Sequence, residues 1–290
     1  MNIKTKADRV IDVFIYIAMA IVVICAVYPI WYITVASFSS NEAVVNGEVT
    51  WWFKDFSLES YATVVKTDNI WTSYGNTVFY SFFGTVVNMF FTITCAYALS
   101  KKWLYGRKLI TLFIMFSMWF SPGMMANYIN YRELGMINSR WGMLLIGAIS
   151  TYNVILMRSF FESIPEALEE SARLDGANEF TILLKIYLPL STAALMTISL
   201  YYFVGHWNSY FWSMILLQDE SKIPLQVVLK KLVVQMDGNS SESANMDYTV
   251  ISRETVVYAT MVIAVLPMLV IYPFVQKFFV KGVMIGAVKG

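Results

Sequence analysis

The sequence predicts an all-α polytopic membrane protein with six transmembrane helices, and three observations lead to this fold class. Hydrophobic residues make up 58% of the 290 residues, and charged residues make up only 14%. Soluble domains carry closer to a quarter charged residues. The apolar residues also form long runs without charge, and each run meets or exceeds the ~20 residues that a helix needs to cross the hydrocarbon core.

Six such runs follow one another along the chain, and they are predicted at residues 13–36, 77–99, 109–131, 141–161, 190–217 and 255–280. The first run is too long for the apolar core of a signal peptide. Ser121-Pro122-Gly123 interrupts the third run and Gly205-His206-Trp207-Asn208 the fifth. Such breaks are tolerated only where the freed backbone groups find protein or water. We therefore expect both breaks to face the interior of the helix bundle.

The distribution of Lys and Arg predicts the orientation in the membrane. One side of the bundle carries thirteen of the 21 basic residues: Lys4, Lys6, Arg9, Lys101, Lys102, Arg107, Lys108, Arg158, Arg173, Lys185, Lys277, Lys281 and Lys289. The side with more positive charge in its loops is cytoplasmic. Both termini are therefore predicted to be cytoplasmic, and the loops 37–76 and 218–254 extracellular.

These outer loops have features of their own. Residues 37–76 hold several aromatic side chains that suit the lipid headgroup level. Leu225, Val228, Leu229, Leu232 and Val233 recur with the period of an amphipathic helix. The loops either receive a protein that delivers substrate or simply cover the bundle, and both interpretations stay open. We expect a single transmembrane domain over residues 1–290.

A polar stretch at residues 162–189 interrupts the apolar pattern on the predicted cytoplasmic side. Ser163 and Glu166 have the spacing of a capping box, and Pro165 suits a first helical turn. Gly176 stands where a left-handed residue would end the helix. A second helical run is predicted from Ala177 to Tyr187. The stretch is therefore predicted to form two short helices at an angle, held against the membrane surface.

The spacing within this stretch resembles the EAA motif of ABC importer permeases, which reads EAA-x3-G-x9-I-x-LP. Glu170-Ser171-Ala172, Gly176, Ile186 and Leu188-Pro189 carry the resemblance, with Ser171 in place of the first alanine. It implies a cytoplasmic coupling helix that docks into a cleft of an ATPase subunit, in a permease of the type I importer fold. The residues expected to couple are Glu166, Ala167, Glu170, Ser171, Ala172, Asp175, Gly176, Ile186, Leu188 and Pro189. We expect Ala167, Ser171 and Ala172 to form the low docking face. The alternative, an ordinary amphipathic connector, does not account for six matched positions at fixed spacing.

The sequence lacks the motifs of several kinds of chemistry. It contains no phosphate-binding loop of the G-x-x-x-x-G-K-[ST] type and no clustered metal ligands, and it has a single histidine. An ion-coupled carrier needs titrating groups at mid-membrane, whereas only His206 lies well inside a predicted span. Nothing indicates a nucleic-acid surface. We expect no catalytic site, metal or cofactor in this chain, so the energy for transport must come from a separate ATPase.

Uncharged polar residues inside the spans are candidates for lining a solute path. Amide, hydroxyl and aromatic side chains together suit sugars, because sugars offer hydroxyl rims and apolar faces. The alternative role is hydrogen bonding between helices, which we also favour for His206. On one helix, Asn208 and Trp212 would share a face, while Trp207 and Tyr210 would pack or lie at the outer interface. The path candidates are Asn127, Asn130, Tyr131, Tyr152, Asn153, Asn208 and Trp212.

A wider resemblance covers nearly the whole chain. The six-span pattern, residues 131–138 before the fourth span and the ending at residues 276–290 are similar to carbohydrate-importer permeases of the MalG type, in the Gram-positive branch for complex oligosaccharides. The resemblance implies a second permease subunit, two ATP-binding subunits that hold ATP and Mg²⁺, and an extracellular lipid-anchored solute-binding protein. It also implies that the protein lies in the bacterial plasma membrane and that its C-terminal tail touches the ATPases. A permease for a peptide or polyol and a membrane scaffold without its own path stay open as alternatives.

Overall fold

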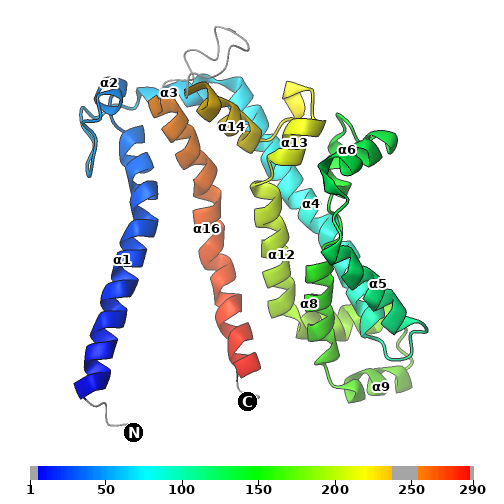
Figure 1. The fold of residues 1–290 in the computed structure, drawn as a ribbon. Helices are drawn as coiled ribbons and strands as arrows, with labels where there is room; N and C mark the ends of the chain where they lie inside the picture. The colour runs from blue at the N-terminus through cyan, green and yellow to red at the C-terminus, as the bar shows by residue number, and fades with distance from the viewer. Residues whose placement is uncertain (1–5, 237–253, 288–290) are drawn as a thin grey trace. The chain divides into compact units, whose positions relative to one another are not determined.

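The computed structural model describes residues 6–236 and 254–287 (Figure 1). The described part of the chain is helical and contains no strand. Contacts divide the chain into two compact units, residues 1–68 with 229–266 and residues 69–228 with 267–290. The predicted outer loop 218–254 lies partly, and the end of the predicted C-terminal tail wholly, outside the described residues.

The first unit contains one long apolar helix, α1 (Lys6–Ser37), and two short helices, α2 (Asn41–Val45) and α3 (Glu59–Lys66). The most apolar window of α1 has none of its residues buried, which suits a helix that faces lipid. Its last turn joins a small core with α2, made by Val35, Ala36, Ala43, Val44 and Val49. The aromatic loop folds back on α1, where the Trp31 indole donates to the carbonyl of Trp51 at 2.9 Å.

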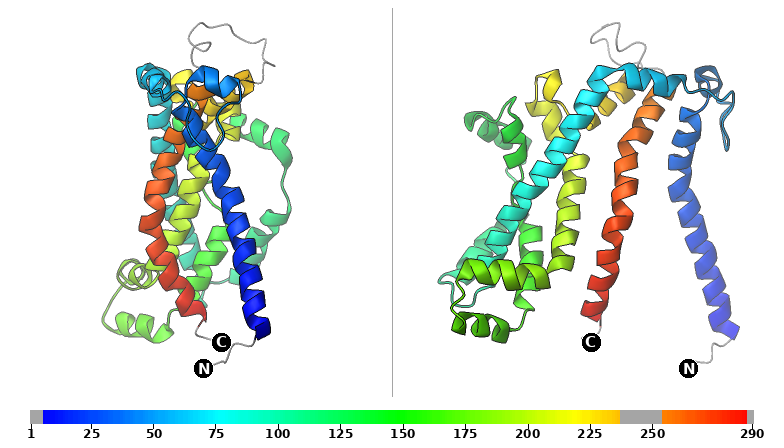
Figure 2. Two further views of the ribbon diagram at one scale, coloured as in Figure 1. Left: turned by 90° about the vertical axis from the view of Figure 1, so that its left-hand side faces the viewer. Right: turned by 180° about the vertical axis from the view of Figure 1, so that it is seen from behind.

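The second unit holds most of the remaining helices, which are seen from two further sides in Figure 2. They are α4 (Asp68–Ser100), α5 (Arg107–Trp119), α6 (Gly123–Glu133), α7 (Arg140–Leu145), α8 (Thr151–Glu162), α9 (Glu166–Leu174), α10 (Glu179–Ile182), a π-helical turn (Leu183–Tyr187), α11 (Leu188–Leu190), α12 (Thr192–Trp207), α13 (Phe211–Leu216) and a 3₁₀ turn (Glu220–Lys222). Two helices cross the boundary between the units, α14 (Leu225–Met236) and α16 (Glu254–Ala287). The amphipathic helix predicted at residues 225–233 is thus confirmed as α14.

Three described helices are long and apolar enough to cross a membrane, and five spans result if each bent helix pair counts as one. α5 and α6 are bent by 117°, because the chain between them passes through Pro122 and through Gly123 at a φ of +81°. The helices on either side of Ser191 are bent by 85°. The fourth predicted span is not one helix, since α7 ends at Leu145 and α8 begins at Thr151, with Gly147 at a φ of +69° between them.

The core of the second unit lies where α4, α8 and α12 meet. It includes Ala96 of α4, Met157 of α8 and Ile198 of α12, all fully buried. The hydroxyls of Thr92 and Tyr202 lie 2.7 Å apart and tie α4 to α12. This core extends to Ile182 and Tyr187 in the segment after α9. The polar stretch at residues 162–189 is therefore attached to the helices that form the bundle.

Candidate functional site

Helix α9 begins differently from the predicted capping box. Pro165 is the N-cap residue and offers no side-chain hydrogen bond. The Ser163 hydroxyl instead donates to the carbonyl of Phe160 at 2.7 Å, and the Glu166 carboxylate lies 2.7 Å from the ammonium of Lys102. The capping-box prediction was wrong, because both side chains are taken by partners outside the first turn of α9.

The end of α9 is as predicted. Gly176 has a φ of +82°, which a residue with a Cβ atom rarely adopts. The Ala177 amide donates to the carbonyl of Ala172 at 2.9 Å, and the Gly176 amide donates to the carbonyl of Arg173 at 3.0 Å. These two hydrogen bonds form a Schellman motif, which satisfies carbonyls that the helix end leaves free.

The chain then turns back toward the core. The Asn178 side chain accepts a hydrogen bond from the amide of Thr181 at 2.8 Å and starts the second helical run. That run is not a uniform α-helix, since a π-helical turn occupies Leu183–Tyr187. Ile186 and Leu188 pack against the core, while Pro189 is exposed in the first turn of α11. The EAA-like stretch therefore contains an exposed part, α9, and an anchored part after it.

A partly buried ionic cluster holds α9 against the end of α4. Lys101 is only 4% exposed, and its ammonium lies 2.6 Å from the Glu169 carboxylate. The Tyr187 hydroxyl donates to the same oxygen at 2.5 Å, and the Tyr97 hydroxyl donates to the Glu179 carboxylate at 2.7 Å. Arg173 pairs with Glu169 at 2.8 Å and also with Glu179. We call these six residues the Lys101 cluster: Tyr97, Lys101, Glu169, Arg173, Glu179 and Tyr187.

The cluster compensates its buried charges well. The Lys101 ammonium lies over the rings of Tyr97 and Tyr187, 4.1 and 4.2 Å from their centroids. Burial by itself raises the pKa of Glu169, but hydrogen bonds from Lys101, Tyr187 and Arg173 outweigh burial and hold that pKa below its usual value. Glu169 is therefore charged at neutral pH. These charge-assisted hydrogen bonds fix the inner side of α9.

The outer side of α9 is uncovered. Leu174 is 89% and Leu168 is 44% exposed, and Ala167 and Ser171 are exposed beside them. We call these four residues the outer face of α9. Ala172 does not belong to it, because it packs against the core of the second unit. Of the docking face predicted from Ala167, Ser171 and Ala172, the structure exposes the first two and leaves Ala172 half-buried. Leu168 and Leu174 give this face apolar surface that no described residue covers.

Other predicted coupling residues are also accessible. Glu166, Glu170, Asp175 and Gly176 are exposed. A cavity of about 750 Å³ lies beside them, between α9 and the loop that joins α4 to α5. It is lined by residues of both segments, among them Lys101, Lys102, Glu166, Glu169 and Glu170.

Sequence analysis missed the Lys101 cluster. Its only local signal was the spacing of Glu169 and Arg173, which is that of an ion pair on a helix. Tyr97 and Lys101 stand at the end of an apolar run, 68 or more residues before their partners. No pattern within one segment pairs residues at such a separation.

The predicted path residues are only partly brought together. The rings of Tyr131 and Trp212 meet edge to face with centroids 5.2 Å apart. Asn127 is half-buried, Asn130 and Tyr152 are exposed, and Asn153 is buried.

Within the described residues no group of three or more His, Cys, Asp or Glu is placed to hold a metal ion.

Asn208 and Trp212 do not share one helical face as predicted. Asn208 is the C-cap of α12, and Trp212 belongs to α13. The helix ends there because Asn208, with a ψ of 2°, leaves the helical conformation. Asn208 is exposed, whereas Trp207 is buried and its ring contacts those of Tyr74 and Phe203.

Comparison with known proteins identifies the family of the chain. Residues 70–285 match the family model described as binding-protein-dependent transport system inner membrane component. The chain belongs to this family. Its members are components of transport systems in the inner membrane, which agrees with the apolar helices of the described residues.

Similar proteins cover nearly the whole chain. A polygalacturonan/rhamnogalacturonan transport system permease protein of Bacillus subtilis is 37% identical, over 98% of this chain and 99% of its own length. Protein LplC of the same organism is also 37% identical, over 99% and 97%. The crystal structure of a bacterial ABC transporter for import of the acidic polysaccharide alginate contains a chain with a TM-score of 0.90 and 41% identity, with 96% of this chain and 100% of that chain covered.

Proposed function

We propose that this family member is a permease subunit of an ATP-driven, binding-protein-dependent importer of oligosaccharides, and that α9 is its coupling helix. The observation that carries the coupling role is the contrast between the two sides of α9. The Lys101 cluster fixes the inner side, while the outer face of α9 exposes Leu168 and Leu174. A helix that is held firmly on one side and open on the other transmits the movement of a docked partner to the bundle.

The proposal includes six membrane spans with both termini in the cytoplasm. The three long helices and the two bent pairs supply five spans. The sixth is α7 with α8, which together occupy residues 140–162. The excess of Lys and Arg on the side of α9 supports the orientation. Residues 1–290 form one permease domain in this scheme.

Other subunits complete the importer. This chain has no phosphate-binding loop, so two ATP-binding subunits bind ATP and Mg²⁺ and hydrolyse the ATP. One of these subunits receives α9. A second permease subunit forms the other half of the path, and an extracellular solute-binding protein delivers the substrate. The family description, which names a binding-protein-dependent system, supports this composition.

The substrate class rests on the relatives. The names of these relatives concern polygalacturonan, rhamnogalacturonan and alginate, all of them carbohydrates. The path in this chain would be lined by Asn127, Asn130, Tyr131, Tyr152, Asn153, Asn208 and Trp212. Among these, the edge-to-face pair of Tyr131 and Trp212 offers aromatic surface, and the exposed amide of Asn208 offers hydrogen bonds.

The experiment is ATPase activity of the complete importer, reconstituted with its solute-binding protein and a panel of neutral oligosaccharides, uronate oligosaccharides, peptides and polyols. We expect stimulation by at least one oligosaccharide and by no peptide or polyol. Stimulation by peptides or polyols alone would overturn the substrate class. A complex that hydrolyses ATP at the same rate with and without every solute would overturn the importer function.

A further inference from the structure

A second cavity lies beside the loop that joins α4 to α5, and the proposed function does not use it. Its volume is about 800 Å³, within the range of small-molecule sites. It is lined by Lys102, Leu104, Tyr105, Gly106, Arg107, Lys108, Leu109, Thr111, Leu112, Met115 and Arg158. We call it the basic cavity, because four of these residues are cations and none is acidic.

The nearby carboxylates do not neutralise the four cations. Arg107 and Arg158 share the single carboxylate of Glu162, and Lys102 pairs with Glu166. Lys108 is exposed and forms no ion pair with any of the described residues. Four positive charges against two negative ones leave the basic cavity with two uncompensated charges. The Nε atom of Arg107 is also buried and without a hydrogen-bond partner among the described residues. The excess positive charge of the cavity therefore favours an anionic ligand.

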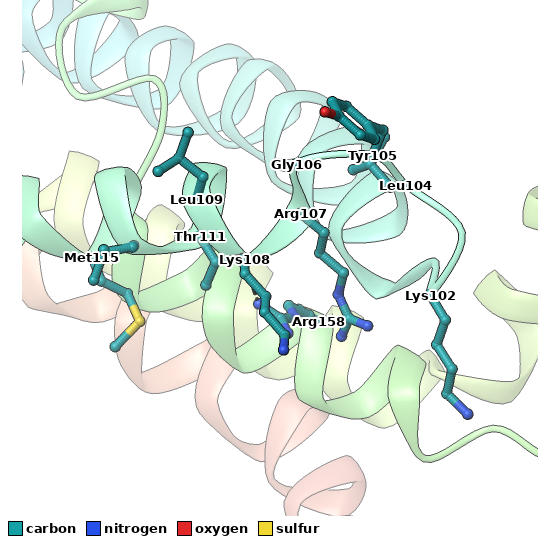
Figure 3. A pocket seen from close by; sticks show the side chains of 11 residues that line it. Lys102, Leu104, Tyr105, Gly106, Arg107, Lys108, Leu109, Thr111, Met115 and Arg158 are labelled. Carbon is teal, nitrogen blue, oxygen red and sulfur yellow. Dashed lines mark hydrogen bonds between the residues drawn. The ribbon is translucent and has the colours of Figure 1, made fainter.

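The wall of the basic cavity changes from charged to apolar along α5. Figure 3 shows Arg107, Lys108 and Arg158 near the start of this helix and Met115 two turns farther along it. Leu109 and Leu112 are 73% and 65% exposed and continue the apolar side. A ligand that fits both ends carries an anionic group next to a hydrocarbon chain.

We propose that the basic cavity binds the headgroup of an anionic phospholipid, with an acyl chain lying along α5 past Leu109, Leu112 and Met115. Guanidinium groups bind phosphate oxygens through paired hydrogen bonds. Basic pockets at the cytoplasmic ends of membrane helices bind such headgroups. The cytoplasmic position follows from the charge distribution of the loops. A soluble anion such as inorganic phosphate would match the charges but would leave the exposed apolar wall uncovered.

The test uses the complete importer in mixed micelles that contain a photoactivatable phosphatidylglycerol. After illumination, mass spectrometry measures crosslinking to the peptide that spans residues 102–115. We expect this peptide to be labelled, and Lys108→Gln to lower the labelling by roughly five-fold, the effect of one basic residue near an anionic surface. Lys108→Arg should restore it. Lys185→Gln is the matched control, since Lys185 is an exposed cation outside the cavity and its loss should change nothing.

Three results would overturn the proposal. Equal labelling by a photoactivatable phosphatidylcholine would show that the headgroup charge is not recognised. Displacement by millimolar inorganic phosphate would assign the cavity to a soluble anion. Absence of labelling in the wild-type complex, with labelling elsewhere on the chain, would show that another subunit covers the cavity. Because Lys108 is exposed and unpaired in the described chain, its variants test binding without disturbing the fold.

Discussion

The ammonium of Lys101 lies 2.6 Å from the carboxylate of Glu169, and this ion pair joins the end of α4 to the middle of α9. The side chains are 4% and 13% exposed. A pair so far removed from water is costly to break from one side, because the remaining charge stays buried without a partner. The attachment of α9 to the bundle therefore depends on both residues together.

We expect Lys101→Met to lower the free energy of local opening of α9 by about 3 kcal/mol, since Glu169 would lose its main counter-ion. Hydrogen exchange of the α9 amides in the complete importer measures this free energy. Lys102→Met is the matched control, because the Lys102–Glu166 pair is exposed and such pairs contribute at most about 1 kcal/mol. Equal effects of the two variants would refute the role of the cluster.

The lowered pKa of Glu169 predicts how this attachment depends on pH. A carboxyl group whose folded pKa is below its unfolded value of roughly 4.3 stabilises the fold above that value. The stabilisation is lost as the pH falls through the folded pKa. Protection of α9 should therefore be constant from neutral pH to about pH 5 and fall below about pH 4. Glu169→Gln should remove this component, and an unchanged acid profile in that variant would contradict the assignment.

The left-handed conformation of Gly176 makes a third prediction. Gly176→Val should destabilise the Schellman motif by roughly 1–2 kcal/mol, so that α9 no longer ends in a fixed orientation. Substrate-stimulated ATPase activity should fall while the complex still assembles. Gly75→Val is the control, because a Cβ atom there meets nothing within 4 Å and the residue has no positive φ. Normal stimulation in the Gly176 variant would argue against coupling through α9.

Close approach of α4 and α12 makes a fourth prediction. A Cβ atom on Gly84 would lie 2.6 Å from Nε2 of His206. Gly84→Ala should therefore lower the free energy of unfolding of the complex by about 1–3 kcal/mol, the usual cost of overpacking. Thermal denaturation of the complex measures this loss. His206→Ala in the same chain should recover most of that loss, whereas Gly205→Ala, where a Cβ atom meets nothing, should have little effect. Failure of the double variant to recover would place the strain elsewhere.

The sequence allowed the exposed half of the site to be predicted but not the buried half. Periodicity and the glycine at position 176 are local signals, so the helix, its end and the exposed positions could be read from one segment. The Lys101 cluster joins segments far apart in the chain, and only the fold determines which charges meet. Ala172 shows the same limit, because the motif alone does not tell which of two neighbouring alanine-like positions turns inward.

The membrane helices show a related limit. Apolar length predicted where the chain enters the hydrocarbon, but it did not predict the angles at Pro122 and Ser191 or the break between α7 and α8. Asn208 was placed on a continuous helix with Trp212, whereas it ends α12. Such breaks depend on backbone conformations at single residues, which hydropathy does not record.

The most direct test of the central claim is site-specific photo-crosslinking from α9 in the complete importer. A photoreactive amino acid at Ser171, which is exposed on the outer face of α9, should crosslink to an ATP-binding subunit. The same amino acid at Asn130, exposed on α6 and located at the outer end of the third predicted span, should not crosslink to it. A product from position 171 alone is the result that the coupling role requires. No product from position 171, or one from position 130, would contradict both the coupling role of α9 and the orientation of the chain.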